Sequence, residues 1–177
     1  MKKGEKGGTT KGMKMCFWNV AGLIIKDKEV WEYLKSFDVI GLTETWIEED
    51  HCEKLKYRLF KEYDWKCRAA MKVSKKGRAK EGIITGINKE LREIEYKEIN
   101  DNIVERNIVY NNKTYRVMVV YNQDTKGTWK EIEERVDGRD EEVMIIGGDW
   151  NARTGEEGGP INEDLGKEKT CDQKKRQ

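Results

Sequence analysis

The chain has 177 residues, enough for one domain with a single core. Charged residues make up 39% of it, but 35 Lys and Arg against 34 Asp and Glu leave a formal net charge of +1, so no whole-chain field selects a polyanionic partner. No apolar run approaches the roughly 18 residues of a membrane-spanning helix, and no signal-peptide stretch follows the N-terminus.

Four cysteines are scattered along the chain: Cys16, Cys52, Cys67 and Cys171. None forms a C-x-x-C pair, and scattered thiols without a signal peptide predict a reducing compartment, nuclear or cytoplasmic, rather than secretion. His51 is the only histidine, so a zinc site is not expected.

The first 13 residues are rich in Lys, Gly and Thr and cannot build a core. We expect residues 1–13 to form a disordered basic arm, which either contacts nucleic acid or is merely solvated. Residues 14–177 would form the domain.

The first elements predict a strand–helix–strand unit. Residues 14–20 (KMCFWNV) form an apolar-aromatic strand, Asp27 is typical of a helix N-cap, and the helix should run to about Phe37. Residues 38–43 (DVIGLT) form a second buried strand, and the right-handed crossover rule makes the two strands parallel. The charged stretch 48–61 is helix or loop.

Strand-like runs dominate the rest of the chain. They cover residues 63–70, 82–88, 103–110 and 113–121. Asn111 and Asn112 indicate a tight hairpin turn between the last two. Thr128 is a candidate cap for a helix to about Val136, and residues 143–146 form a further buried strand. The elements together predict a mixed α/β domain.

Polar side chains follow four of the predicted strands. These side chains are Asn19, Glu44, Tyr121 and Asp149. Ligands of open α/β sheets sit beyond the carboxyl ends of the strands, and the parallel first unit should bring Asn19 and Glu44 to one rim. The carboxylate of Glu44 and the amide oxygen of Asn19 together suit Mg²⁺. Four polar residues on one rim favour a site over four separate strand ends.

The segment 147–155 reads GGDWNARTG and places Asp149, Asn151 and Arg153 among glycines. Gly, Asn and Asp are common in any turn, but a plain turn does not require the whole set. We interpret the segment as a catalytic loop whose glycines let the chain turn sharply after the strand.

Five segments resemble successive motifs of the endonuclease/exonuclease/phosphatase family. They are CFWNVAGL, DVIGLTETW, EGIITGI, the strand ending VVY at Tyr121, and IIGGDWNARTG, in family order across residues 14–155. The last loop is most similar to GDFNARTG of non-long-terminal-repeat retrotransposon endonucleases and craniofacial-development-protein-2-like proteins, with Trp150 in place of Phe. The resemblance implies a four-layer α/β sandwich of two mixed β-sheets flanked by helices, with metal-dependent phosphoester hydrolysis at one end.

The resemblance also implies roles for individual residues. Glu44 would bind Mg²⁺, or Mn²⁺ in its place, with Asn19 beside the metal. Asp149 would orient or deprotonate the attacking water. Tyr121 would place its hydroxyl on the scissile phosphate or help to orient that water, and Asn151 would hydrogen-bond a phosphate oxygen.

Two departures from the family pattern affect these expectations. Asn122 directly follows Tyr121, where the family usually has proline with an asparagine further on, and Asn122 takes over that amide's role or the loop lacks it. The family's closing Asp-Tyr and Ser-Asp-His motifs are not found before Gln177, and we do not expect His51 to replace their histidine. The resemblance thus implies a domain missing its C-terminal strands, with weak or lost activity. Arg153 pairs with a flanking phosphate or is an ordinary surface arginine.

Three functions stay open at this point. The first is an Mg²⁺-dependent endonuclease acting on DNA, and the second is a catalytically inactive retroelement-derived remnant or nucleic-acid-binding module. A phosphatase of small phosphoesters ranks third, because no small-molecule pocket is marked and the ARTG loop favours the retroelement group. No membrane or protein partner is indicated.

Overall fold

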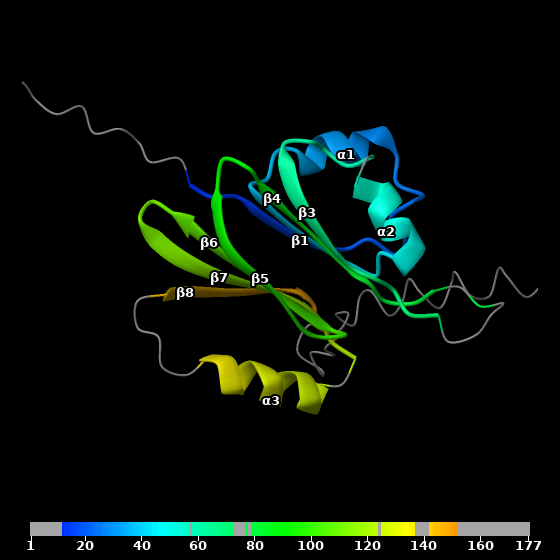
Figure 1. Ribbon diagram of the computed structural model, residues 1–177. Helices are drawn as coiled ribbons and strands as arrows, with labels where there is room; N and C mark the ends of the chain where they lie inside the picture. Colours follow the sequence, from blue (N-terminus) through cyan, green and yellow to red (C-terminus); the bar gives the residue numbers. More distant parts are fainter. Residues whose placement is uncertain are drawn as a thin grey trace, which may run out of the picture.

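The computed structural model describes residues 12–56, 58–72, 77, 79–123, 125–136 and 142–151 (Figure 1). These residues form two four-stranded sheets, with strand orders β1-β2-β4-β3 and β5-β6-β7-β8. Helices α1 and α2 cover the outer face of the first sheet, and α3 covers the outer face of the second (Figure 1). The predicted four-layer arrangement of two mixed sheets between helices is confirmed. The elements are β1 Met15–Asn19, α1 Lys28–Leu34, β2 Val39–Thr43, α2 Glu49–Lys56, β3 Tyr63–Arg68, β4 Ile83–Asn88, β5 Arg92–Asn100, β6 Ile103–Tyr110, β7 Lys113–Tyr121, α3 Thr125–Val136 and β8 Glu142–Asp149.

The strand–helix–strand unit forms as predicted. β1 and β2 are parallel, with Asn19 opposite Thr43. The Asp27 side chain caps α1 by accepting a hydrogen bond from the Val30 N–H at 3.1 Å. The helix ends at Leu34, three residues before the predicted Phe37, and the charged stretch after β2 contains α2.

Buried apolar side chains fill the spaces between the layers. Under α1 and α2 lie, among others, Leu34, Ile40, Leu42, Trp65 and Ile84. Between the two sheets lie Val39, Ile87, Ile108 and Val117. Against α3 lie Met118, Val120 and Ile132. β2 contributes to two of these layers, which explains its continuous apolar sequence.

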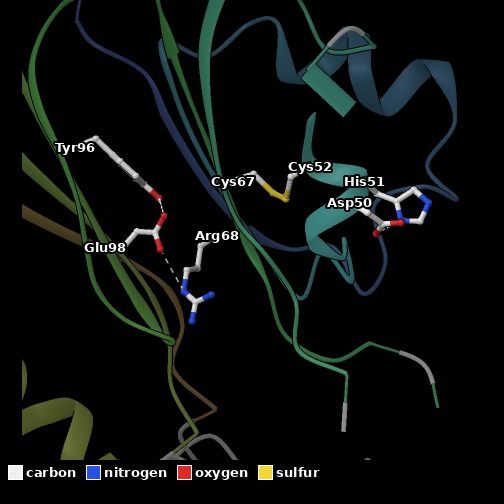
Figure 2. The surroundings of a disulfide bond; sticks show 7 residues. All are labelled: Asp50, His51, Cys52, Cys67, Arg68, Tyr96 and Glu98. Carbon is white, nitrogen blue, oxygen red and sulfur yellow. Dashed lines mark hydrogen bonds and ion pairs between the residues drawn. A yellow bond between two sulfur atoms is a disulfide. The ribbon is translucent and has the colours of Figure 1, made fainter. Parts of the chain in front are cut away.

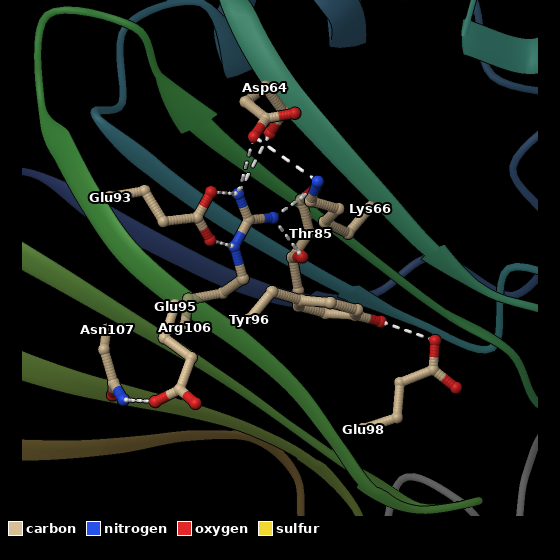
Figure 3. A network of polar contacts seen from close by, with 9 residues as sticks. All are labelled: Asp64, Lys66, Thr85, Glu93, Glu95, Tyr96, Glu98, Arg106 and Asn107. Carbon is tan, nitrogen blue, oxygen red and sulfur yellow. Dashed lines mark hydrogen bonds and ion pairs between the residues drawn. The ribbon is translucent and has the colours of Figure 1, made fainter.

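A buried arginine joins the two sheets (Figure 3). Arg106 on β6 is fully buried, and its guanidinium donates to both carboxylate oxygens of Glu93 on β5. It also crosses to the first sheet, where it donates to the Thr85 hydroxyl at 2.8 Å and to the Asp64 carbonyl at 3.3 Å. Its charge is therefore both paired and hydrogen-bonded, as burial requires.

β5 was not predicted from the sequence. Its ladder to β6 has irregularities at Glu93/Glu95 and Glu98/Asn100, so its partly buried residues are Glu93, Tyr96 and Ile99, three positions apart. Bulges of this kind destroy the alternation that marks a strand in sequence. The expected hairpin between β6 and β7 is confirmed by positive φ at Asn111 (50°) and Asn112 (60°).

The interpretation of the GGD segment as a sharp turn is wrong. Gly147 and Gly148 continue β8 and pair with Val119 and Val120 of β7. A Cβ on Gly147 would lie 2.3 Å from the Phe17 ring, and one on Gly148, whose φ is +143°, would lie 1.9 Å from the Val120 carbonyl oxygen. The glycines therefore permit close approach of ring and backbone within the sandwich.

Helix α3 and the cysteines also differ from expectation. α3 begins at Thr125, so Thr128 is a buried residue of its first turn rather than its cap.

Cys52 on α2 and Cys67 on β3 form a disulfide across the outer face of the first sheet (Figure 2). The expectation of four separate thiols is wrong for this pair, because folding brings together residues 15 positions apart. Cys16 is free, and Cys171 lies outside the described residues.

Helices in the described part of the chain are all too short or too polar to span a membrane. Apart from residues 12 and 13, the predicted basic arm lies outside the described residues, as does everything after Asn151.

Candidate active site

The carboxyl ends of four strands meet at one end of the sandwich. Asn19 ends β1 and Glu44 directly follows β2, while Tyr121 and Asp149 end the parallel strands β7 and β8 and lie opposite each other. These are the four positions that the strand-end rule picks out, two from each sheet.

Two hydrogen bonds hold the four side chains together across the sheets. The Asn19 side-chain amide donates to Asp149 Oδ2 at 2.5 Å, and the Tyr121 hydroxyl donates to Glu44 Oε1. Each bond joins a residue of the first sheet to one of the second. The polar cluster therefore depends on both sheets being in place.

Trp46 is a site residue that the sequence pattern did not reveal. Its indole N–H donates to Glu44 Oε2 at 2.5 Å. Both Glu44 (φ 53°) and Trp46 (φ 58°) have left-handed backbone, which turns the indole back toward the carboxylate. Gly22 makes room for the ring, since a Cβ there would lie 2.5 Å from it. The segment TETW ends at Trp46, but the amino-acid sequence does not indicate that the backbone is left-handed there.

Left-handed backbone is concentrated at this end of the molecule. Ala21, Glu44, Trp46 and Asn151 all have positive φ, between 43° and 58°. Non-glycine residues adopt this region at some cost and tend to do so at functional sites. The loops after β1, β2 and β8 are thus held in conformations that ordinary strand exits do not require.

Tyr121 is 9% exposed and remains protonated at neutral pH. The pKa of Tyr121 is raised to about 12, first by burial and then by the hydrogen bond to Glu44 and the charge of Glu44, while hydrogen bonds with Gln123 and Asn151 oppose the shift. Its hydroxyl is therefore a hydrogen-bond donor, held against the carboxylate.

The two asparagines tie the neighbouring loops together. Asn122 is 2% exposed, and its side-chain amide donates to the Trp150 carbonyl at 2.7 Å. Asn151 donates its side-chain amide to the Asn122 carbonyl at 2.9 Å and its backbone N–H to Asp149 Oδ1 at 3.0 Å. Six of the seven predicted site residues therefore lie at this rim, and the seventh, Arg153, lies outside the described residues.

His51 lies on α2, half exposed, with its ring 3.1 Å from Asp50 (Figure 2).

Among the described residues, no three His, Cys, Asp or Glu side chains gather into a ready-made metal site. The rim instead offers Glu44 and Asp149 with the amide oxygen of Asn19. This is a partial set of hard oxygen ligands, which suits Mg²⁺ because that ion keeps water and phosphate in its other positions.

Solved structures share this fold, although no family model and no curated protein matches the chain. Humanized D. rerio TDP2 carrying 14 mutations has a TM-score of 0.56 and 18% identity, over 89% of this chain and 78% of that one. D. rerio TDP2 complexed with a single-strand DNA product has a TM-score of 0.60 and 20% identity, over 88% and 70%. The Xenopus laevis APE2 catalytic domain has a TM-score of 0.57 and 16% identity, over 79% and 59%.

These neighbours all belong to the endonuclease/exonuclease/phosphatase superfamily. The chain therefore has the fold of that superfamily, two mixed sheets packed between helices.

Proposed function

We propose that the chain is an Mg²⁺-dependent phosphodiesterase that cleaves DNA as an endonuclease. The observation that carries the proposal is the convergence of Asn19, Glu44, Tyr121 and Asp149 on one rim, joined by hydrogen bonds between the sheets. The motif order supports the same chemistry, and the neighbour complexed with single-strand DNA product supports a polynucleotide substrate. The GGDWNARTG segment supports a relationship to retrotransposon endonucleases.

Hydrolysis of a phosphodiester needs a cation, a positioned water and a base. Glu44 and Asn19 would hold Mg²⁺, which would neutralise phosphate oxygens when bound. Asp149 is the base in this proposal. Its two oxygens already accept hydrogen bonds from Asn19 and from the Asn151 backbone, so the carboxylate is fixed while lone pairs remain to accept a proton from water.

The other polar groups serve the phosphate. Tyr121 keeps its proton and can donate its hydroxyl to a phosphate oxygen once that oxygen competes with Glu44. Asn151 is exposed at the rim and would hydrogen-bond the same group. Arg153 would pair with a flanking phosphate. Asn122 would act through the loop that it holds in place.

Nicking of supercoiled plasmid DNA tests this proposal. The wild-type chain with Mg²⁺ is compared with Glu44→Gln and Asp149→Asn, which keep side-chain shape but remove the charge. Each variant should lose about 10²–10³ in rate. Glu62→Gln removes an exposed carboxylate that follows α2 and should nick like wild type.

Two results would contradict the proposal. A folded wild-type chain that does not nick, or Glu44→Gln and Asp149→Asn variants that nick as fast as wild type, would favour a non-catalytic nucleic-acid-binding module. Release of phosphate from small soluble phosphoesters without nicking would instead favour a phosphatase.

A further inference from the structure

A cavity of about 400 Å³ lies on the outer face of the first sheet, between the β1–α1 loop, α1 and the segment that follows α2. Its apolar wall consists of Leu23, Ile24, Trp31, Leu55, Leu59 and Phe60. Cationic side chains line the rest of it, namely Lys26, Lys28 and Arg58, with Glu32 among them. It therefore joins an aromatic surface to a positively charged one.

The aromatic wall is held in place by its neighbours. Trp31 and Phe60 meet edge to face with ring centroids 5.8 Å apart. The Phe60 carbonyl accepts a hydrogen bond from the Trp65 indole at 3.0 Å, which anchors this segment to β3. Trp31 remains partly exposed, so the cavity offers a positioned aromatic surface.

The cavity's positive charge is not cancelled. Glu32 pairs with Lys35 at 3.0 Å, which neutralises the one acidic side chain in the lining. Within the part of the chain that the structure describes, neither Lys28 nor Arg58 has a carboxylate partner, and Lys26 lies 5.3 Å from the Trp18 ring centroid. An anion would therefore complement the cavity.

The cavity is also connected to the candidate active site. The loop that supplies Leu23 leaves β1 directly after Asn19. Its backbone is bound to the segment that carries Glu44, through Gly22 N–H to the Glu44 carbonyl at 2.8 Å and Leu23 N–H to the Thr45 carbonyl at 3.1 Å. A wall of the cavity is thus fixed to the residues at the rim.

We infer that this cavity binds one nucleotide of the polynucleotide substrate, on a flank of the scissile phosphate. The base stacks on Trp31, because Lys35 Nζ already lies over the Phe60 ring, 4.7 Å from its centroid. The phosphate lies against Lys28 and Arg58. An aromatic surface beside unpaired cations is the chemistry that binds single-stranded nucleic acid. The inference rests on the proposed function for its substrate, but binding here requires neither Glu44 nor a metal.

Fluorescence anisotropy of a fluorescein-labelled dT12 strand, in EDTA, tests the inference. The double variant Lys28→Ala/Arg58→Ala should bind at least fivefold more weakly than wild type. Lys113→Ala/Lys130→Ala removes two exposed lysines elsewhere and should change binding less than twofold. An abasic strand of the same length should bind wild type several-fold more weakly than dT12, because it cannot stack.

The inference is overturned if both double variants bind equally, or if the abasic strand binds as tightly as dT12. Plasmid nicking, measured on the same proteins, separates the two proposals. Binding that depends on Lys28 and Arg58 without any nicking would leave the cavity assigned and contradict the endonuclease. Nicking by wild type, with equal binding of dT12 by both double variants, would instead support the endonuclease and contradict the assignment of the cavity.

Discussion

At the scale of single residues, Tyr121 offers a direct probe of the site. Its pKa is raised from 10.0 to about 12, chiefly by burial, with Glu44 adding to the shift. Because the folded-state pKa is the higher one, neutral Tyr121 contributes stability that is fully present below pH 10 and lost as the pH rises through about 12. The ultraviolet absorbance difference between wild type and Tyr121→Phe should therefore titrate near pH 12. A midpoint near pH 10 would show that the hydroxyl is neither buried nor held by Glu44.

Side-chain orientation sets the limit of what the sequence reveals at this scale. Asn19, Glu44, Tyr121 and Asp149 could be predicted, because each lies at the end of a recognisable strand. The Trp46 indole could not, since its direction depends on left-handed backbone at Glu44 and at Trp46 itself. The pattern of apolar residues shows where a strand ends. The conformation of a loop depends instead on its contacts with the rest of the fold.

At the scale of elements, β8 depends on having no side chain at Gly147. A Cβ at this position would lie 2.3 Å from the Phe17 ring, so either β8 or the ring must move. Overpacking of this kind costs about 1–3 kcal/mol. Gly147→Ala should lower the free energy of unfolding by that amount in denaturant titrations. Gly12→Ala is the control, because a Cβ there meets nothing within 4 Å. Equal stability of the two variants would contradict this account of the glycine.

Strands differ in how much of their position the sequence reveals. β2 is buried along its whole length, and its apolar run is visible without any alignment of partners. β5 forms an edge of the second sheet, and two bulges set its partly buried residues three apart, so its charged sequence does not resemble a strand. β5 forms because it pairs with the edge of β6. Its own sequence does not contain that information.

At the scale of the whole molecule, the two sheets are joined by a buried charge as well as by apolar packing. Arg106 comes from the second sheet, and its hydrogen bonds to Thr85 and Asp64 reach two strands of the first (Figure 3). The candidate site takes residues from both sheets, so its geometry depends on this packing. Such a cross-sheet contact is invisible to local sequence patterns, which place Arg106 only in a strand.

Replacing Arg106 tests how strongly the sandwich depends on it. Arg106→Met leaves the mostly buried Glu93 carboxylate without its partner, and should lower the free energy of unfolding by about 3–5 kcal/mol. Lys66→Met is the matched control, because Lys66 and Asp64 form an exposed pair at 3.7 Å, and such pairs contribute about 0–1 kcal/mol. The double variant Arg106→Met/Glu93→Leu should be more stable than Arg106→Met alone, since no unpaired charge is then buried. Denaturant unfolding followed by fluorescence and circular dichroism measures all three. A cost for Arg106→Met no larger than that for Lys66→Met would mean that apolar packing alone holds the two sheets, and with them the rim, together.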